Sequence, residues 1–147
     1  MEKEQILLSQ LSTIHLIQNN SKYLIISIIR QVDEPIRLID FCLKHGADVN
    51  FSDPSGWTAL HEAVKLNDFK LVKYLLKFGA DANKPCPTSI VDPREYYTPF
   101  EFACILSDEC IVREMIGYGA DVTKKIDNKF FAITLTISPI VKELIRG

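Results

Sequence analysis

The sequence predicts an all-α fold: a helical solenoid of about four helix-turn-helix repeats, with β-hairpin-like loops and degenerate terminal caps. The first observation is a recurring segment, because residues 43–50 return in similar form as residues 76–83, 33 positions later. A shorter copy, residues 116–122, follows after a further 40 positions. The second observation is that apolar residues recur at helical spacing before each copy. Helices this short are marginal alone, so neighbouring units must stack to bury their apolar faces.

The whole chain, residues 1–147, is expected to form one domain, since domains of about this size are common. Its beginning, residues 1–20, predicts an amphipathic capping helix with Leu7 and Leu11 on one side. Residues 21–52 predict a degenerate repeat that keeps the second helix and the following turn. A solenoid must cap its open ends, so degenerate terminal units are expected.

Residues 53–85 form the best-defined unit. Thr58 is a good N-cap for a first helix, and apolar residues follow it at helical spacing. Residues 67–68, Asn-Asp, break this run, and residues 71–76 predict a second amphipathic helix. Gly79 is expected to end that helix as a C-cap residue.

The third unit, residues 86–125, carries a seven-residue insertion between Asn83 and Thr98, where prolines accumulate. In its turn, Tyr96 stands where the second unit has a glycine, so we expect a different local hairpin. Residues 126–147 predict a truncated last repeat that caps the chain.

The second unit carries the pattern Asp53-x-x-Gly56-x-Thr58-Ala59-Leu60-His61-x-Ala63, then Leu71-Val72-x-x-Leu75-Leu76-x-x-Gly79-Ala80-Asp81-x-Asn83. By this pattern it resembles an ankyrin repeat along its whole length. Ala59 replaces the proline of the family's T-P-L-H box, and the third unit has Phe100 and Glu101 where leucine and histidine are usual. These departures leave the expected ankyrin-repeat fold in place.

Composition excludes several classes of function. Lysine and arginine number 17 against 19 acidic residues, which disfavours a nucleic-acid partner, because such domains are usually basic. No apolar run approaches the roughly 20 residues of a membrane-spanning helix, so no membrane insertion is expected. The four cysteines form no C-x-x-C pair or disulfide framework, which favours a reducing, cytoplasmic location.

No nucleophile motif, metal motif or phosphate loop is present, so we expect no enzyme activity, no metal and no cofactor. The resemblance implies a structural role for His61, which would bond the box threonine and the neighbouring hairpin. It likewise implies that Asp48, Asp81 and Asp121 are hairpin residues, since calcium loops space their ligands two residues apart. An enzyme or small-molecule site using His61 is the alternative, and Glu101 in place of the box histidine is its only support.

The resemblance implies that the chain binds a partner protein through hairpin tips, the lengthened 84–97 loop and the concave face of the first helices, as a monomer. Trp57 is the only tryptophan, and tryptophan, tyrosine and arginine dominate interface hot spots. The alternatives are that Trp57 packs against the next hairpin, and that Tyr96 and Tyr97 only cover the third core. The candidate contact residues are Pro54, Ser55, Trp57, Lys65, Leu66, Arg94, Glu95, Tyr96, Tyr97 and Ile105.

Two further interpretations concern the kind of source organism and a candidate modification of Asn83. Frequent isoleucine, lysine and asparagine indicate an AT-rich coding sequence, as in some intracellular bacteria and large DNA viruses, where small ankyrin proteins resemble host-directed effectors or host-range factors. An ordinary cytosolic adaptor is the alternative. Asn83 also resembles the hairpin asparagines that the asparaginyl hydroxylase of oxygen sensing modifies, so the protein is a candidate substrate.

Overall fold

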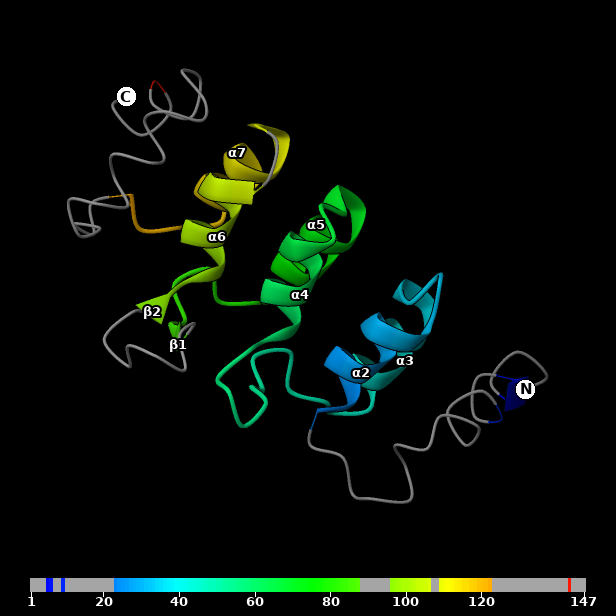
Figure 1. The fold of residues 1–147 in the computed structure, drawn as a ribbon. Coiled ribbons are helices and arrows are strands. Elements are labelled where there is room, and N and C mark those ends of the chain that lie inside the picture. Colours follow the sequence, from blue (N-terminus) through cyan, green and yellow to red (C-terminus); the bar gives the residue numbers. More distant parts are fainter. Residues whose placement is uncertain are drawn as a thin grey trace.

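In the computed structural model, the described residues between 23 and 122 form six helices that stack as three pairs along one row (Figure 1). The structure describes residues 5–6, 9, 23–87, 96–106, 109–122 and 143. This arrangement confirms the predicted all-α repeat solenoid. The predicted terminal caps, residues 1–20 and 126–147, lie almost entirely outside the described residues. The pairs are α2 (Leu24–Gln31) with α3 (Ile36–Lys44), α4 (Ala59–Lys65) with α5 (Phe69–Lys77), and α6 (Pro99–Leu106) with α7 (Glu109–Gly117).

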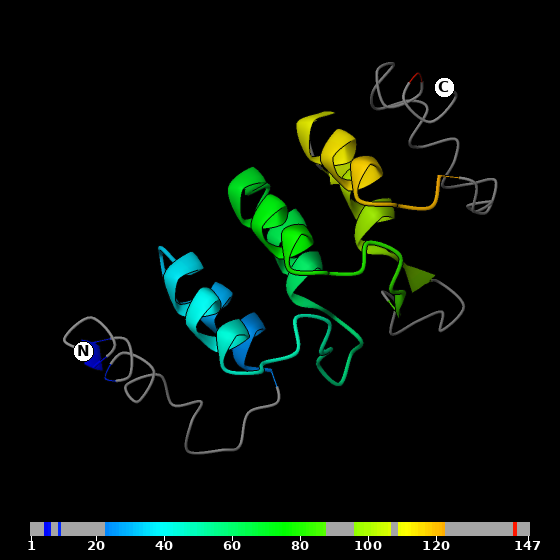
Figure 2. The same ribbon diagram turned by 180° about the vertical axis from the view of Figure 1, so that it is seen from behind.

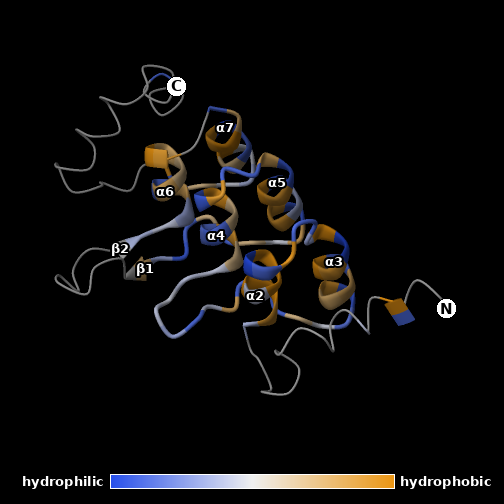
Figure 3. Ribbon diagram, turned by 45° about the vertical axis from the view of Figure 1, so that its right-hand side comes forward, coloured by the Kyte–Doolittle hydropathy of each residue, from blue (hydrophilic) through white to orange (hydrophobic). Residues whose placement is uncertain are grey.

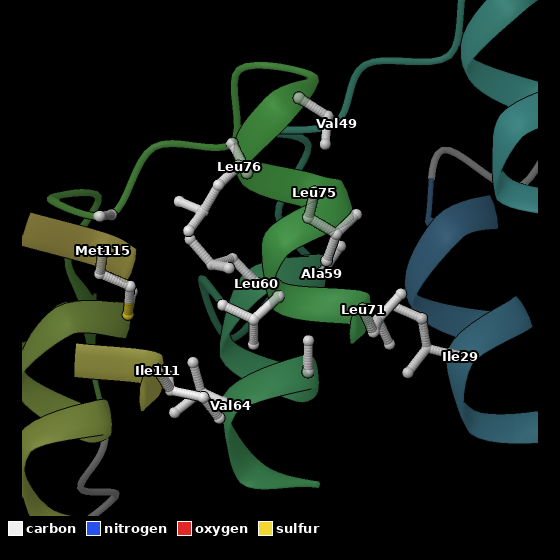
Figure 4. Packing of buried hydrophobic residues seen from close by; sticks show 14 of the residues in the cluster. Ile29, Val49, Ala59, Leu60, Val64, Leu71, Leu75, Leu76, Ile111 and Met115 are labelled. Atoms are coloured by element: carbon white, nitrogen blue, oxygen red, sulfur yellow. The ribbon is translucent and has the colours of Figure 1, made fainter. Parts of the chain in front are cut away.

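The helices form two layers. The first helices of the pairs, α2, α4 and α6, pack against one another in order, and the second helices form the other layer, which faces the viewer in Figure 2. The core lies between the layers and continues from pair to pair (Figure 4). Its central members are fully buried: Ile28, Ile39, Ala63, Val64, Leu71, Val72, Leu75, Ile111, Val112 and Met115.

The predicted helix boundaries in the second unit have clear local causes. Asn67 adopts a left-handed conformation with φ of 53°, which ends the run of α4. The Asp68 carboxylate then accepts a hydrogen bond from the backbone N–H of Leu71 at 3.1 Å and caps α5. Gly79, with φ of 85°, follows the end of α5, where a residue with a Cβ atom would be strained.

A short antiparallel ladder closes the lengthened loop of the third unit. The strand β1 (Cys86–Pro87) pairs with β2 (Tyr96–Tyr97), with Cys86 opposite Tyr97. The second unit has only an isolated bridge between Ser52 and Thr58 at the corresponding place. The two strands form a hairpin stem at the ends of the lengthened loop. This stem differs from the single bridge of the second unit, in line with the different hairpin expected at Tyr96.

Candidate protein-binding surface

His61 is fully buried and ties two repeats together. Its ring Nδ1 accepts a hydrogen bond from the backbone N–H of Thr58 at 3.2 Å, and its Nε2 lies 3.1 Å from the carbonyl oxygen of Tyr97. Both contacts are satisfied by a neutral imidazole that carries its proton on Nε2. Burial lowers the pKa of His61 from 6.5 to about 4, so the ring is neutral at pH 7. His61 thus caps α4 and braces the next hairpin, as the resemblance implied.

Glu101 performs the same capping with a different side chain. Its carboxylate accepts a hydrogen bond from the backbone N–H of Thr98 at 2.6 Å, and its own N–H donates to the Thr98 hydroxyl at 3.1 Å. This reciprocal pair is a capping box. Glu101 was the only support for a catalytic site, and its carboxylate instead caps the N-terminus of α6.

Trp57 lies half-buried between two repeats. Its indole stacks on the His61 ring, with centroids 4.9 Å apart, and meets the Phe102 ring of α6 edge-on at 5.2 Å. Its Nε1 donates a hydrogen bond to a carboxylate oxygen of Glu62 at 2.7 Å. The packing alternative for Trp57 is thus realised in part, because the residue packs on Phe102 of the next repeat and is half-buried, not fully buried.

Glu62 is the centre of a charge cluster that sequence reasoning missed. Its carboxylate, only 6% exposed, lies 3.0 Å from the Arg30 guanidinium of α2 and 3.9 Å from the Lys65 ammonium. Arg30 also lies 3.6 Å from Asp53. A buried carboxylate is costly unless it is paired, and the Trp57 indole and the two cations supply the partners. The only sequence signal was a charged residue at 62 inside an otherwise apolar run.

The other candidate contact residues lie at helix ends, at a hairpin tip and in the lengthened loop. Lys65 and Leu66 are exposed at the end of α4, and Ile105 is half-buried near the end of α6. Ser55 is exposed at a hairpin tip that the Asp53 carboxylate holds by accepting hydrogen bonds from two backbone N–H groups at 3.0 Å.

Pro54 is exposed beside Ser55, and Tyr97 is half-buried with its ring 6.1 Å from that of Phe102. Tyr96 lies in β2, and its backbone alone is described. Arg94 and Glu95 lie outside the described residues. That these residues contact a partner protein stays a prediction.

Asn83 joins the second hairpin to the third. Its side-chain N–H donates to the carbonyl oxygen of Gly119 at 3.1 Å, and its Oδ1 accepts from the backbone N–H of Asp121 at 2.7 Å. Asn50 makes the equivalent pair of bonds one repeat earlier, to Gly79 and Asp81. This bracing role was missed from the sequence, and the hydroxylation of Asn83 stays a prediction.

Cys86 and Cys104 are buried thiols, whereas Cys110 is exposed. Burial raises the pKa of Cys104 to about 12 and that of Cys86 to about 11, so both thiols stay protonated at pH 7. Among the described residues, no three His, Cys, Asp or Glu side chains are placed to hold a metal ion. None of the described helices has the length and apolar character needed to cross a membrane.

Comparison with known proteins supports this description. A family model of ankyrin repeats in three copies matches residues 5–86 and 25–126. The chain is 31% identical over 95 residues to palmitoyltransferase AKR1 of Kluyveromyces lactis, covering 65% of this chain and 12% of that protein. It is 47% identical over 49 residues to human ankyrin repeat and SOCS box protein 6, covering 33% and 12%. It is 33% identical over 79 residues to the putative ankyrin repeat protein FPV014 of Fowlpox virus, covering 54% and 17%.

The match spans only a small part of each relative. Because about 12% of the first two proteins is covered, the activities that their names describe are not carried over to this chain.

Proposed function

Since the chain belongs to the ankyrin-repeat family, we propose that it is a non-catalytic module that binds a partner protein through the layer of its first helices. The observation that carries the proposal is a set of exposed or half-buried side chains at the neighbouring helices α2, α4 and α6. We call this set the inner surface: Arg30, Trp57, Lys65, Leu66, Ile105 and Leu106. The hairpin tip at Ser55 and the 84–97 loop are expected to add contacts at its border.

Trp57 is well suited to anchor a partner. The Glu62 carboxylate and the His61 ring hold its indole, so binding immobilises no freely rotating side chain. Affinity gains when such ordering costs are avoided, and tryptophan is enriched among residues that dominate interfaces. A catalytic role has less support, because His61 and Glu101 are engaged in helix capping.

A pair of matched double variants tests the proposal. Lys65→Glu with Leu66→Ser changes two adjacent exposed residues at the end of α4, on the inner surface. Lys77→Glu with Phe78→Ser makes the same kind of change at the end of α5, in the other layer. We expect the first variant to lose the proteins that co-purify with the wild type, and the second to retain them. Equal recovery by both folded variants would remove the inner surface as the binding site.

A host-directed role is the second candidate for the same surface. It is supported by the similarity to a Fowlpox virus protein and by the AT-rich coding sequence that the composition indicates. Recovery of an inner-surface-dependent partner from uninfected animal cells would support this role. Recovery only from the source organism's own cells would contradict it and favour an ordinary adaptor.

We also propose that the protein acts as a monomer in the cytoplasm. Support for a reducing compartment comes from the four cysteines, all of which are free thiols. Light scattering coupled to gel filtration should give one species near 16.7 kDa, whereas a species of twice that mass would contradict the monomer.

A further inference from the structure

The charge cluster at α2 and α4 is neutral in sum but positive at its exposed side. The carboxylates of Glu62 and Asp53 are 6% and 15% exposed, whereas the Arg30 and Lys65 side chains are 46% and 59% exposed. A molecule that approaches the inner surface here therefore meets two cations first. Their carboxylate partners lie beneath them and keep the cations close together on either side of Glu62.

The positive part of the inner surface is confined to one end. The exposed acidic residues Asp33 and Glu34 follow the end of α2. They limit the positively charged patch to the two cations beside Glu62, Arg30 and Lys65. At the place in α6 equivalent to Glu62, 40 positions on, the chain carries Phe102. No carboxylate stands at that position to hold cations against α6.

The opposite end of the inner surface is apolar. Leu66 at the end of α4 and Leu106 at the end of α6 occupy equivalent positions and are 55% and 53% exposed. Ile105 and Phe102 are half-buried beside them on α6. Figure 3 shows this contrast at the C-terminal ends of the helices: the end of α6 is hydrophobic and the end of α2 is hydrophilic.

We propose that the partner presents a segment with an acidic end and an apolar end, laid across α2, α4 and α6 in that order. This inference rests on the proposed function and specifies the chemistry of the partner. The acidic end pairs with Arg30 and Lys65, and the apolar end covers Leu66, Ile105 and Leu106. Charge complementarity fixes the direction, because the reverse order would place carboxylates on leucines and leave both cations beside apolar groups.

The size of the surface sets the spacing within the segment. Packed helices lie about 10 Å apart, so the axes of α2 and α6 are separated by about 20 Å. An extended chain rises about 3.3 Å per residue and covers this distance in about six residues. The acidic and apolar groups of an extended partner segment should therefore lie within about six positions of each other.

Selection from a displayed library of random 16-residue peptides tests the inference without knowledge of the natural partner. The full chain is immobilised, and enriched peptides are sequenced. We expect the enriched peptides to combine aspartate or glutamate with leucine, isoleucine, phenylalanine or tryptophan a few positions away. Enrichment of basic or uncharged peptides would overturn the inference, and so would the absence of any enrichment.

Neutralising variants locate the acidic contact. Arg30→Gln with Lys65→Gln should weaken binding of the selected peptides at least tenfold, and Lys65→Gln alone, which keeps the ion pair of Arg30 with Glu62, about threefold. The matched control, Lys70→Gln with Lys77→Gln on exposed positions of α5, should leave affinity unchanged. Peptides whose affinity falls equally in the control variant would contradict the assignment.

Leu66→Ser with Leu106→Ser locates the apolar contact. It should weaken binding at least tenfold at any salt concentration, whereas the effect of the neutralising variants should shrink as salt screens the charges. Unchanged affinity in this variant would overturn the apolar half of the inference.

Failure of this inference and failure of the proposed function give different results. If proteins still co-purify through the inner surface while no acidic and apolar peptide is enriched, the module binds a partner of other chemistry. If nothing co-purifies through the inner surface, the proposed function itself fails.

Discussion

Acidification should destabilise the fold through His61 in particular. The pKa of His61 is lowered by burial to about 4 in the folded chain, against 6.5 for a free side chain. The unfolded chain therefore binds more protons than the folded chain between these two values, so stability rises with pH across this window. The contribution is fully present above pH 6.5 and is lost as the pH falls toward 4. One pKa unit corresponds to about 1.4 kcal/mol, so the whole contribution is about 3 kcal/mol, of which about 2 kcal/mol disappears between pH 7 and pH 5.

Urea unfolding followed by circular dichroism at pH 7, 6 and 5 measures this loss. His61→Gln removes the titrating group, so its unfolding free energy should be lower at pH 7 but should change less between pH 7 and pH 5. His45→Gln is the control for the same substitution at an exposed histidine, at the end of α3.

The comparison of the two variants decides the outcome. Equal pH dependence in the wild type and His61→Gln would refute the reasoning, since the proton uptake would then belong to other groups. A wild type that becomes more stable as the pH falls from 7 to 5 would refute the sign.

Three further predictions concern single residues and are checked by urea unfolding at pH 7. Glu62→Ala should cost about 2–4 kcal/mol, because it leaves the cation and the indole around it without their acceptor, while Glu62→Gln, which keeps an acceptor oxygen, should cost less. Gly79→Ala should cost about 1 kcal/mol through its positive φ alone, since no atom lies within 4 Å of the added Cβ. Gly117→Ala, in equally open space at the last residue of α7, should stabilise by less than the roughly 0.5–1 kcal/mol of a helix interior. Asn83→Ala should cost about 1–3 kcal/mol, because the third hairpin loses both hydrogen bonds to the second; no loss would show that the bonds are not needed.

The repeat pattern was enough to predict both helices of the second unit and the second helix of the first unit, because the causes are local. Thr58 and Asp68 begin helices through caps that act within three residues, and Gly79 ends one through its own backbone conformation. Such short-range causes are visible in a sequence.

Contacts between repeats could not be predicted in the same way. Arg30 and Glu62 are 32 residues apart, and their pairing depends on how closely α2 packs beside α4. The carbonyl oxygen of Tyr97 accepts the hydrogen bond of His61 Nε2, and its position depends on the β1–β2 hairpin stem of the lengthened loop. The Glu62 cluster therefore emerges only from the stacked structure, although Trp57 and Lys65 within it were expected at the surface.

The central claim is that a partner protein covers the inner surface, and Trp57 can report this directly. It is the only tryptophan, so protein labelled with 5-fluorotryptophan should give one fluorine NMR resonance. Addition of a co-purified partner should shift or broaden this resonance in the wild type and in the Lys77→Glu, Phe78→Ser control. An unchanged resonance at saturating partner, with binding established by calorimetry, would contradict the claim and move the interface elsewhere.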